Sequence, residues 1–148
     1  MAYSVQLTTK WADFDPNGHM RHTAYNDYAA ECRVRLFDSQ GLSLTELNKL
    51  RQGPVLFTEN TNFKREVRIG EDLVVDVRLK ACDKEGSRFR FFHRVFKTDG
   101  VLAAEIEVFG GWLDLDRRKL IEADQVIMEA IGRMEKTEDF VWIERNKK

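Results

Sequence analysis

The segment from Asp13 to His22 concentrates side chains that can move protons and bind a carbonyl group. Two aspartates, one asparagine and two histidines surround a Pro–Asn–Gly turn: Asp13, Asp15, Asn17, His19 and His22. An apolar pattern of helical spacing follows at once. The segment therefore lies where the unpaired N–H groups of a helix N-terminus point outward. A carboxylate beside such donors is what acyl transfer requires, so the segment predicts an active site.

Metal binding is a weaker interpretation of the same residues. The run from Asp13 to Gly18 matches the first six positions of an EF-hand loop, but Ala24 stands at the twelfth, where a bidentate glutamate is needed. A strand, not a helix, is expected before the loop. A zinc site of mixed carboxylates and histidines fits no structural zinc spacing. The sequence predicts neither a metal nor a cofactor.

A purely structural interpretation is also open for these polar residues. Asp13, Asp15 and Asn17 are all types that form side-chain turns and cap helices. Their convergence with two histidines in one short turn, facing an apolar helix, favours a pocket instead.

The long element that would position this turn is a helix. Thr23 is the expected N-cap, the helix runs to about Gln40, and Gly41 is its stop. Its apolar surface is wider than a narrow stripe, which indicates a helix largely surrounded by protein. A first strand over Ser4 to Lys10 precedes the turn, and residues 42–50 predict a short second helix.

The rest of the chain alternates with a period of two, which is typical of strands. The strands are expected at Val55–Val67, Leu73–Ala81, Arg88–Lys97 and Val101–Leu115, followed by an amphipathic helix at about 124–136. Short turns between these strands predict that neighbouring strands are antiparallel. The pair Gly110–Gly111 predicts a bulge or a close approach of two backbones. The fold class predicted is α+β, one domain over residues 1–148, with a curved antiparallel sheet wrapped around one long helix.

Composition excludes several function classes. The net charge of −1 gives no global field for nucleic acid or an anionic membrane, and no apolar run approaches the ~20 residues of a membrane span. No signal peptide precedes the first strand. Cys32 and Cys82 are expected to be buried, reduced thiols, which favours the cytoplasm.

Three motifs together resemble a known family. The run Asp15-Pro16-Asn17-Gly18 resembles the Asp-Pro-x-Gly turn of 4-hydroxybenzoyl-CoA thioesterases. The spacing of Trp11, Asp13, Asp15, Asn17 and His19, followed by Tyr25 and Glu31, also resembles acyl-acyl-carrier-protein thioesterases. Residues 63–73 resemble the family's strand turn, with Glu66 where proline is usual. The chain is thus similar to hot-dog-fold thioesterases.

The resemblance implies roles for individual residues. Asp15 matches the family's catalytic carboxylate, which acts as general base or as nucleophile. His22 matches the position whose backbone N–H polarises the thioester carbonyl. Asn17 and His19 match an Asn-x-His pair that orients substrate and exchanges protons. Asp13 is more simply a turn residue and Glu31 a buried partner of a polar group.

A second set of residues is expected to hold the substrate. Its members are Thr23, Lys64, Arg65 and Arg68. The three cations, or separately residues 117–119, would bind the phosphates of coenzyme A, and solvated surface charge is an equally good interpretation of each cluster.

The resemblance implies an acyl-CoA thioesterase that releases a free acid and coenzyme A. It also implies a homodimer or a dimer of dimers with the site at the subunit interface. Two alternatives stay open: a thioesterase acting on acyl-carrier protein, and a hot-dog domain that binds an acyl ligand without hydrolysis.

Overall fold

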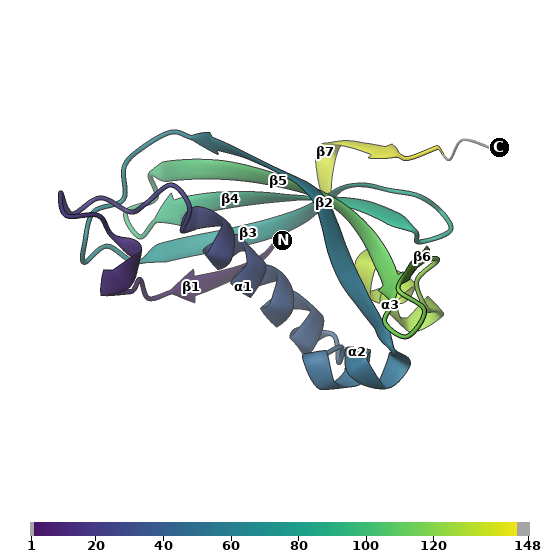
Figure 1. The fold of residues 1–148 in the computed structure, drawn as a ribbon. Helices are drawn as coiled ribbons and strands as arrows, with labels where there is room; N and C mark the ends of the chain where they lie inside the picture. Colours follow the sequence, from purple (N-terminus) through teal and green to yellow (C-terminus); the bar gives the residue numbers. More distant parts are fainter. Residues whose placement is uncertain (1, 145–148) are drawn as a thin grey trace.

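The computed structural model describes residues 2–144 and contains one curved sheet with helices on its concave side and at one end (Figure 1). Along the chain the elements are β1 (Tyr3–Leu7), a 3-10 turn η1 (Trp11–Asp13), α1 (Tyr25–Ser39), α2 (Leu44–Leu50), β2 (Gln52–Phe63), β3 (Leu73–Cys82), β4 (Arg88–Lys97), β5 (Leu102–Asp114), β6 (Lys119–Ile121), α3 (Gln125–Gly132) and β7 (Lys136–Trp142).

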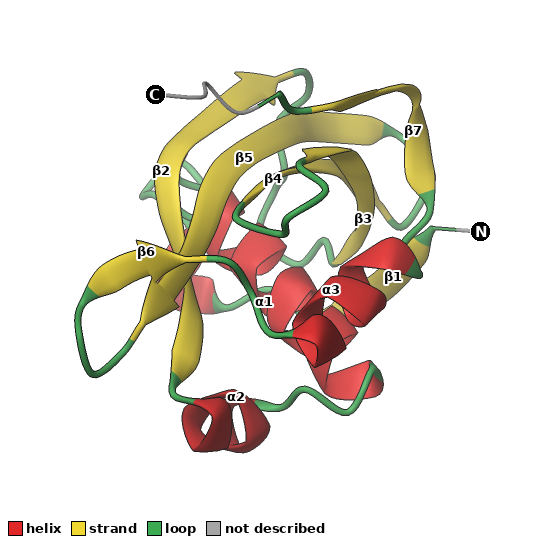
Figure 2. Cartoon of the chain, turned by 90° about the vertical axis from the view of Figure 1, so that its right-hand side faces the viewer, coloured by secondary structure: helices red, strands yellow, loops and turns green. Residues whose placement is uncertain are grey.

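The strand order is β1-β3-β4-β5-β2, with every neighbour antiparallel. The short β6 folds back and pairs antiparallel with the end of β5, and β7 pairs in parallel with β3. Figure 2 shows this sheet curling around α1. The predicted α+β architecture, a curved antiparallel sheet around one long helix, is confirmed.

The core lies between α1 and the concave face of the sheet. The helix buries six side chains: Tyr25, Tyr28, Ala29, Cys32, Leu36 and Phe37. Near its C-terminal end Phe37 meets Phe91 and Trp112, with ring centroids 6.2 and 5.8 Å apart. Aromatic burial of this kind dominates core energetics, so it fixes where the helix lies on the sheet.

Glycine permits the tight crossing of β2, β4 and β5. A Cβ on Gly110 would lie 2.2 Å from the carbonyl oxygen of Val55, and one on Gly111 would lie 2.7 Å from that of Ser87. The predicted close backbone approach is therefore confirmed, because no larger residue fits between these strands. The register of β2 on β5 shifts opposite this point, between Leu56 and Thr58.

Several predicted boundaries are wrong for identifiable reasons. Thr23 is not the N-cap, because Ala24 occupies that position in helical geometry with no side-chain cap. The second strand begins at Gln52 and ends at Phe63, since Pro54 is accommodated within a strand that has β5 on only one side. Its spatial neighbour is β5, so it is not paired with β3, the next strand in the chain.

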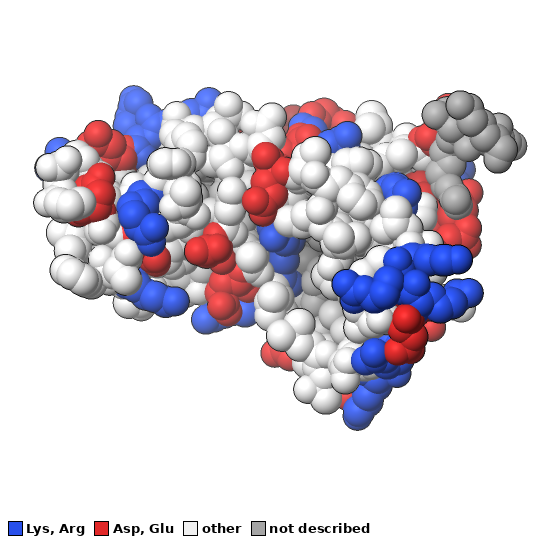
Figure 3. Space-filling model, in the orientation of Figure 1, with Lys and Arg blue, Asp and Glu red and all other residues white. Residues whose placement is uncertain are grey.

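The C-terminal part also differs from the prediction. The last helix ends at Gly132 instead of continuing to about residue 136, and the chain then forms β7 on the edge of β3. Both cysteines are buried free thiols, as expected. No helix among residues 2–144 is long and apolar enough to cross a membrane. The face drawn in Figure 3 mixes cations and anions.

Candidate active site

The turn before α1 holds the Asp15 carboxylate by backbone hydrogen bonds. Its Oδ1 accepts from the N–H groups of Asn17 (2.9 Å) and His19 (3.1 Å). The Gly18 N–H donates to the Asp15 carbonyl at 2.9 Å, and Gly18 takes a positive φ of 79° that glycine adopts readily. Among residues 2–144, Oδ2 of Asp15 receives no protein donor. The turn therefore orients the carboxylate and leaves one oxygen for a ligand.

This turn is joined to the segment that follows β2. The Met20 N–H donates to the Val67 carbonyl and the Ile69 N–H donates to the Gly18 carbonyl, each at 2.8 Å. Val67 is fully buried. The turn at Asp15 and the segment 63–73, which both resemble the family, thus lie side by side and are joined by backbone hydrogen bonds.

An open cavity of about 600 Å³ lies where these segments meet the start of α1. Its lining comprises Asp15, His19, Met20, Arg21, His22, Thr23, Tyr25, Phe63, Lys64, Arg65 and Glu66. A volume of this size is in the range of small-molecule sites.

His22 and Thr23 lie in the turn just before α1, and both line this cavity. The helix has no side-chain cap, and in the described chain the backbone N–H groups of His22 and Thr23 have no protein acceptor. Uncapped donors at a helix N-terminus attract a negatively polarised oxygen. The cavity therefore combines a carboxylate with N–H donors, as acyl transfer requires.

Six of the eight predicted site residues line the cavity. They are Asp15, His19, His22, Thr23, Lys64 and Arg65. Asn17 and Arg68 are not part of the lining. Both are exposed, Asn17 contributes its backbone N–H to Asp15, and the Arg68 N–H donates to the Glu71 carboxylate at 3.4 Å.

The structure adds residues that the sequence did not single out for the site. Glu66 lies 3.2 Å from Nε2 of His19, across the cavity rim. Phe63 packs edge-on against Tyr25, with ring centroids 5.1 Å apart, and burial raises the pKa of Tyr25. The available signal for Glu66 was its place at the position where the family's motif usually has proline.

Two acidic residues near the turn have structural roles. Asp13 accepts a 2.6 Å hydrogen bond from the Tyr28 hydroxyl, which itself accepts from the Lys10 N–H. Burial, reinforced by this bond, raises the pKa of Tyr28 to about 12. Glu31 is exposed and pairs with Arg35 at 2.8 Å, so the expectation of a buried partner was wrong.

The described residues contain no group of three or more histidine, cysteine or acidic side chains arranged to hold a metal ion. The calcium and zinc interpretations thus gain no support from the geometry.

Comparison with solved structures shows the same fold. A protein of Staphylococcus aureus solved in complex with CoA superposes with a TM-score of 0.83 at 24% identity, covering 97% of this chain and 90% of its own. The 1,4-dihydroxy-2-naphthoyl-CoA thioesterase of Synechocystis superposes with a TM-score of 0.79 at 18% identity, covering 90% of this chain and 97% of its own. A DHNA-CoA thioesterase of Staphylococcus aureus gives 0.79 at 19% identity, covering 88% of each chain.

Sequence comparison identifies the family. Comparison with curated proteins gives no match. The sequence profile of the thioesterase-like superfamily matches residues 9–131, which include the turn, the residues that line the cavity and strands β2 to β6. The fold expected from the resemblance, a hot-dog fold, is confirmed by the structural neighbours. The chain belongs to the thioesterase-like superfamily.

Proposed function

We propose that this protein hydrolyses acyl-CoA thioesters to a free acid and coenzyme A. One observation carries the proposal: Asp15 lines the same open cavity as His22 and Thr23, the two residues before α1 whose backbone N–H groups have no acceptor in the described chain. A thioester carbonyl gains negative charge on its oxygen as it is attacked, and preorganised N–H groups stabilise that charge.

Asp15 has two chemically complete routes. As a general base, its free Oδ2 takes a proton from water while the water oxygen attacks the thioester carbon. As a nucleophile, Oδ2 attacks that carbon itself and forms an anhydride, which water then cleaves. In both routes the backbone N–H groups of His22 and Thr23 stabilise the oxyanion. The C–S bond breaks, and the departing sulfur leaves as the coenzyme A thiolate, which takes up a proton.

Coenzyme A as the carrier is supported by charge and by the neighbours. Lys64 and Arg65 border the cavity, where their cations suit phosphate groups. One structural neighbour was solved with CoA, and others are named as CoA thioesterases. His19, paired with Glu66, is proposed to exchange protons beside Asp15.

We further propose a homodimer that forms through β2. This strand pairs with β5 on one side only, and its residues 58–60 are exposed. An uncovered edge of this length is a template for a second strand. Light scattering tests this directly, since a 17.3 kDa chain that stays monomeric contradicts the proposal.

We also propose a cytoplasmic location, which the two free cysteines support, because thiols stay reduced there.

The hydrolysis proposal is tested with a panel of acyl-CoA thioesters, followed by release of the free thiol. Wild-type protein is expected to turn over at least one class, and Asp15→Asn to lose activity by about 10²–10⁴-fold while it stays folded. Asp27→Asn makes the same change on the exposed first turn of α1, outside this cavity, and should leave turnover unchanged.

Two results would overturn the proposal. Full activity in Asp15→Asn would rule out Asp15 as the catalytic carboxylate. Inertness of the wild type on every acyl-CoA, with turnover of acyl-carrier-protein thioesters, would assign the carrier protein as the substrate instead.

A further inference from the structure

A second cavity, of about 220 Å³, lies between α1, α2, β2 and β4 and shares no lining residue with the cavity at Asp15. Its walls are apolar, formed by side chains that include Val34, Phe37, Leu47, Leu56 and Phe91. An apolar cavity of ~150 Å³ is enough to hold benzene. The space therefore accommodates the body of a small organic molecule.

Arg33 is the one charged residue among those that line this cavity. Its Nη1 donates to Nε2 of His93 at 3.0 Å. Among residues 2–144 it has no other hydrogen bond and no ion pair. Burial lowers the pKa of the guanidinium, and the charge of Glu59 opposes this shift. A guanidinium stays protonated at neutral pH, so a largely buried cation here lacks a bonded anion.

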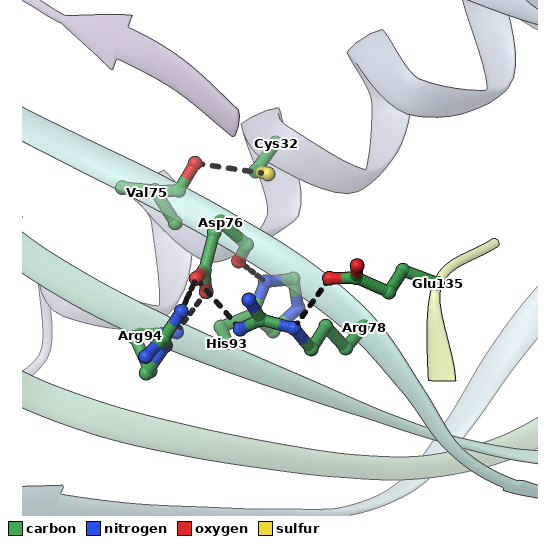
Figure 4. Close-up of polar contacts among 7 residues, drawn as sticks. All are labelled: Cys32, Val75, Asp76, Arg78, His93, Arg94 and Glu135. Atoms are coloured by element: carbon green, nitrogen blue, oxygen red, sulfur yellow. Dashed lines mark hydrogen bonds and ion pairs between the residues drawn. The ribbon is translucent and has the colours of Figure 1, made fainter. Parts of the chain in front are cut away.

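His93 orients this cation without neutralising it. The ring is fully buried, and burial together with the charge of Arg33 lowers its pKa to about 3, so it is neutral. Because arginine can only donate, Nε2 must accept, and the ring proton lies on Nδ1 and is donated to the Asp76 carbonyl at 2.9 Å. Figure 4 shows the ring against this carbonyl group.

The nearest buried carboxylate is engaged elsewhere. Asp76 accepts from Nε and Nη2 of Arg94 at 2.9 and 2.7 Å, and from Nη1 of Arg78 at 3.1 Å (Figure 4). Glu59, on β2, accepts from the Asn26 amide at 3.4 Å. Neither carboxylate bonds to Arg33. Leaving a desolvated charge unpaired is costly, and a bidentate carboxylate is the partner that suits a guanidinium best.

We propose that this second cavity binds a carboxylate with a compact apolar body. The carboxylate pairs with the free N–H groups of Arg33, and the body packs against Val34, Leu56 and Phe91. His93 acts as a positioning residue that fixes the guanidinium. The site is independent of Asp15, although an acid of this kind is also the product of the proposed hydrolysis.

The probe for this site is hexanoate, titrated into the full chain by calorimetry, with the Arg33 side-chain N–H followed by NMR. Hexanol has the same apolar body without the charge and should bind at least tenfold more weakly. Arg33→Met keeps the apolar stem and should lower hexanoate affinity by about 10- to 100-fold. Arg35→Met makes the same change at an exposed position paired with Glu31, and should bind as the wild type does.

Further variants keep the test decisive. Ala30→Phe fills the cavity without touching the charge and should abolish binding even if Arg33→Met fails to fold. Asp15→Asn should bind hexanoate normally, which separates this site from the proposed hydrolysis. Equal binding of hexanol, or unchanged affinity in Arg33→Met, would overturn the proposal. The proposal would also be overturned if the wild type does not bind hexanoate and Arg33→Met changes the molar mass of the protein in solution. A second copy of the chain would then supply the anion for Arg33.

Discussion

Asp15 and Asp76 show two different uses of a carboxylate in one small domain. Asp15 lies in a turn at the mouth of an open cavity, where one oxygen accepts two backbone N–H groups and the other has no protein donor in the described chain. Asp76 is buried on β3, where Oδ1 accepts from the Arg94 backbone N–H and Oδ2 accepts from the guanidinium groups of Arg94 and Arg78. The first carboxylate is oriented but available, whereas the second is fully engaged.

This difference separates chemistry from stability. A carboxylate that keeps an unpaired oxygen beside a cavity can hold water, so its loss should reduce turnover more than folding. A buried carboxylate between two partly exposed arginines holds strands together, so its loss removes the anion at the centre of this network. The Asp76 network also extends to the segment between α3 and β7, because Arg78 bonds Glu135 at 2.8 Å.

The sharpest test of this comparison exchanges each carboxylate for its amide. Asp15→Asn should lose ~10²–10⁴-fold in turnover with little change in the free energy of unfolding. Asp76→Asn should lose about 3 kcal/mol of that free energy while each folded molecule keeps its turnover. Urea unfolding and thiol release, measured on both variants, give the result.

A partly exposed carboxylate with two cationic partners provides the control for Asp76. Glu107 pairs with Arg90 at 3.2 Å and with Lys80 at 3.5 Å, and its side chain is 31% exposed against 7% for Asp76. Glu107→Gln should therefore cost less than about 1 kcal/mol. If Glu107→Gln costs as much as Asp76→Asn, burial is not what distinguishes the two networks.

The next effect is a pH dependence of stability that arises at His93. Its pKa is about 3 in the folded protein against 6.5 for the free group, so the unfolded chain binds more protons between these values. The contribution of His93 is full above pH 6.5 and is lost as pH falls towards 3.

A variant isolates this contribution. His93→Gln keeps an acceptor for Arg33 but does not titrate. Subtracting its unfolding free energy from that of the wild type should leave a slope of up to about 1.4 kcal/mol per pH unit below pH 6. A flat difference between pH 4 and 7 would show that folding does not lower the pKa of His93.

The fold could be predicted from local patterns wherever the pairing is local. The β3–β4 and β4–β5 hairpins follow from alternation and turn residues, and their pairing is confirmed. The β2–β5 pairing joins residues as far apart in the chain as Phe63 and Ala104, with β3 and β4 between them in sequence, and no turn signal predicts it. The strand Lys136–Trp142 was missed because it is mostly exposed and pairs only at the edge of β3, so it carries little apolar alternation.

The predicted phosphate contacts give the next effect in size. Lys64→Gln and Arg65→Gln should each raise KM for an acyl-CoA about three- to tenfold and leave kcat unchanged, because they remove binding that is equal in ground and transition states. Added salt should weaken the wild type in the same way. Arg68→Gln, exposed and outside the cavity lining, should match the wild type.

The candidate site could be predicted only where its residues are close in sequence. The turn from Asp15 to Thr23 has its chemistry in one short segment, so its residue types disclosed it. Arg33 and His93 are sixty positions apart in the chain, and each alone has an ordinary structural interpretation. The contact of His93 with an unpaired guanidinium depends on how α1 crosses β4, which the sequence patterns do not define.

The smallest expected effect concerns Glu31, which belongs to the residue spacing that resembles acyl-acyl-carrier-protein thioesterases. In the structure its carboxylate pairs with Arg35 on the same exposed face of α1, 49% exposed on each side. Glu31→Gln should change the free energy of unfolding by less than about 0.5 kcal/mol and leave turnover within twofold. Thermal unfolding and thiol release measure both quantities. A tenfold loss of turnover at normal stability would mean that Glu31 meets the substrate, which requires a second subunit to bring a thioester to that face of the helix.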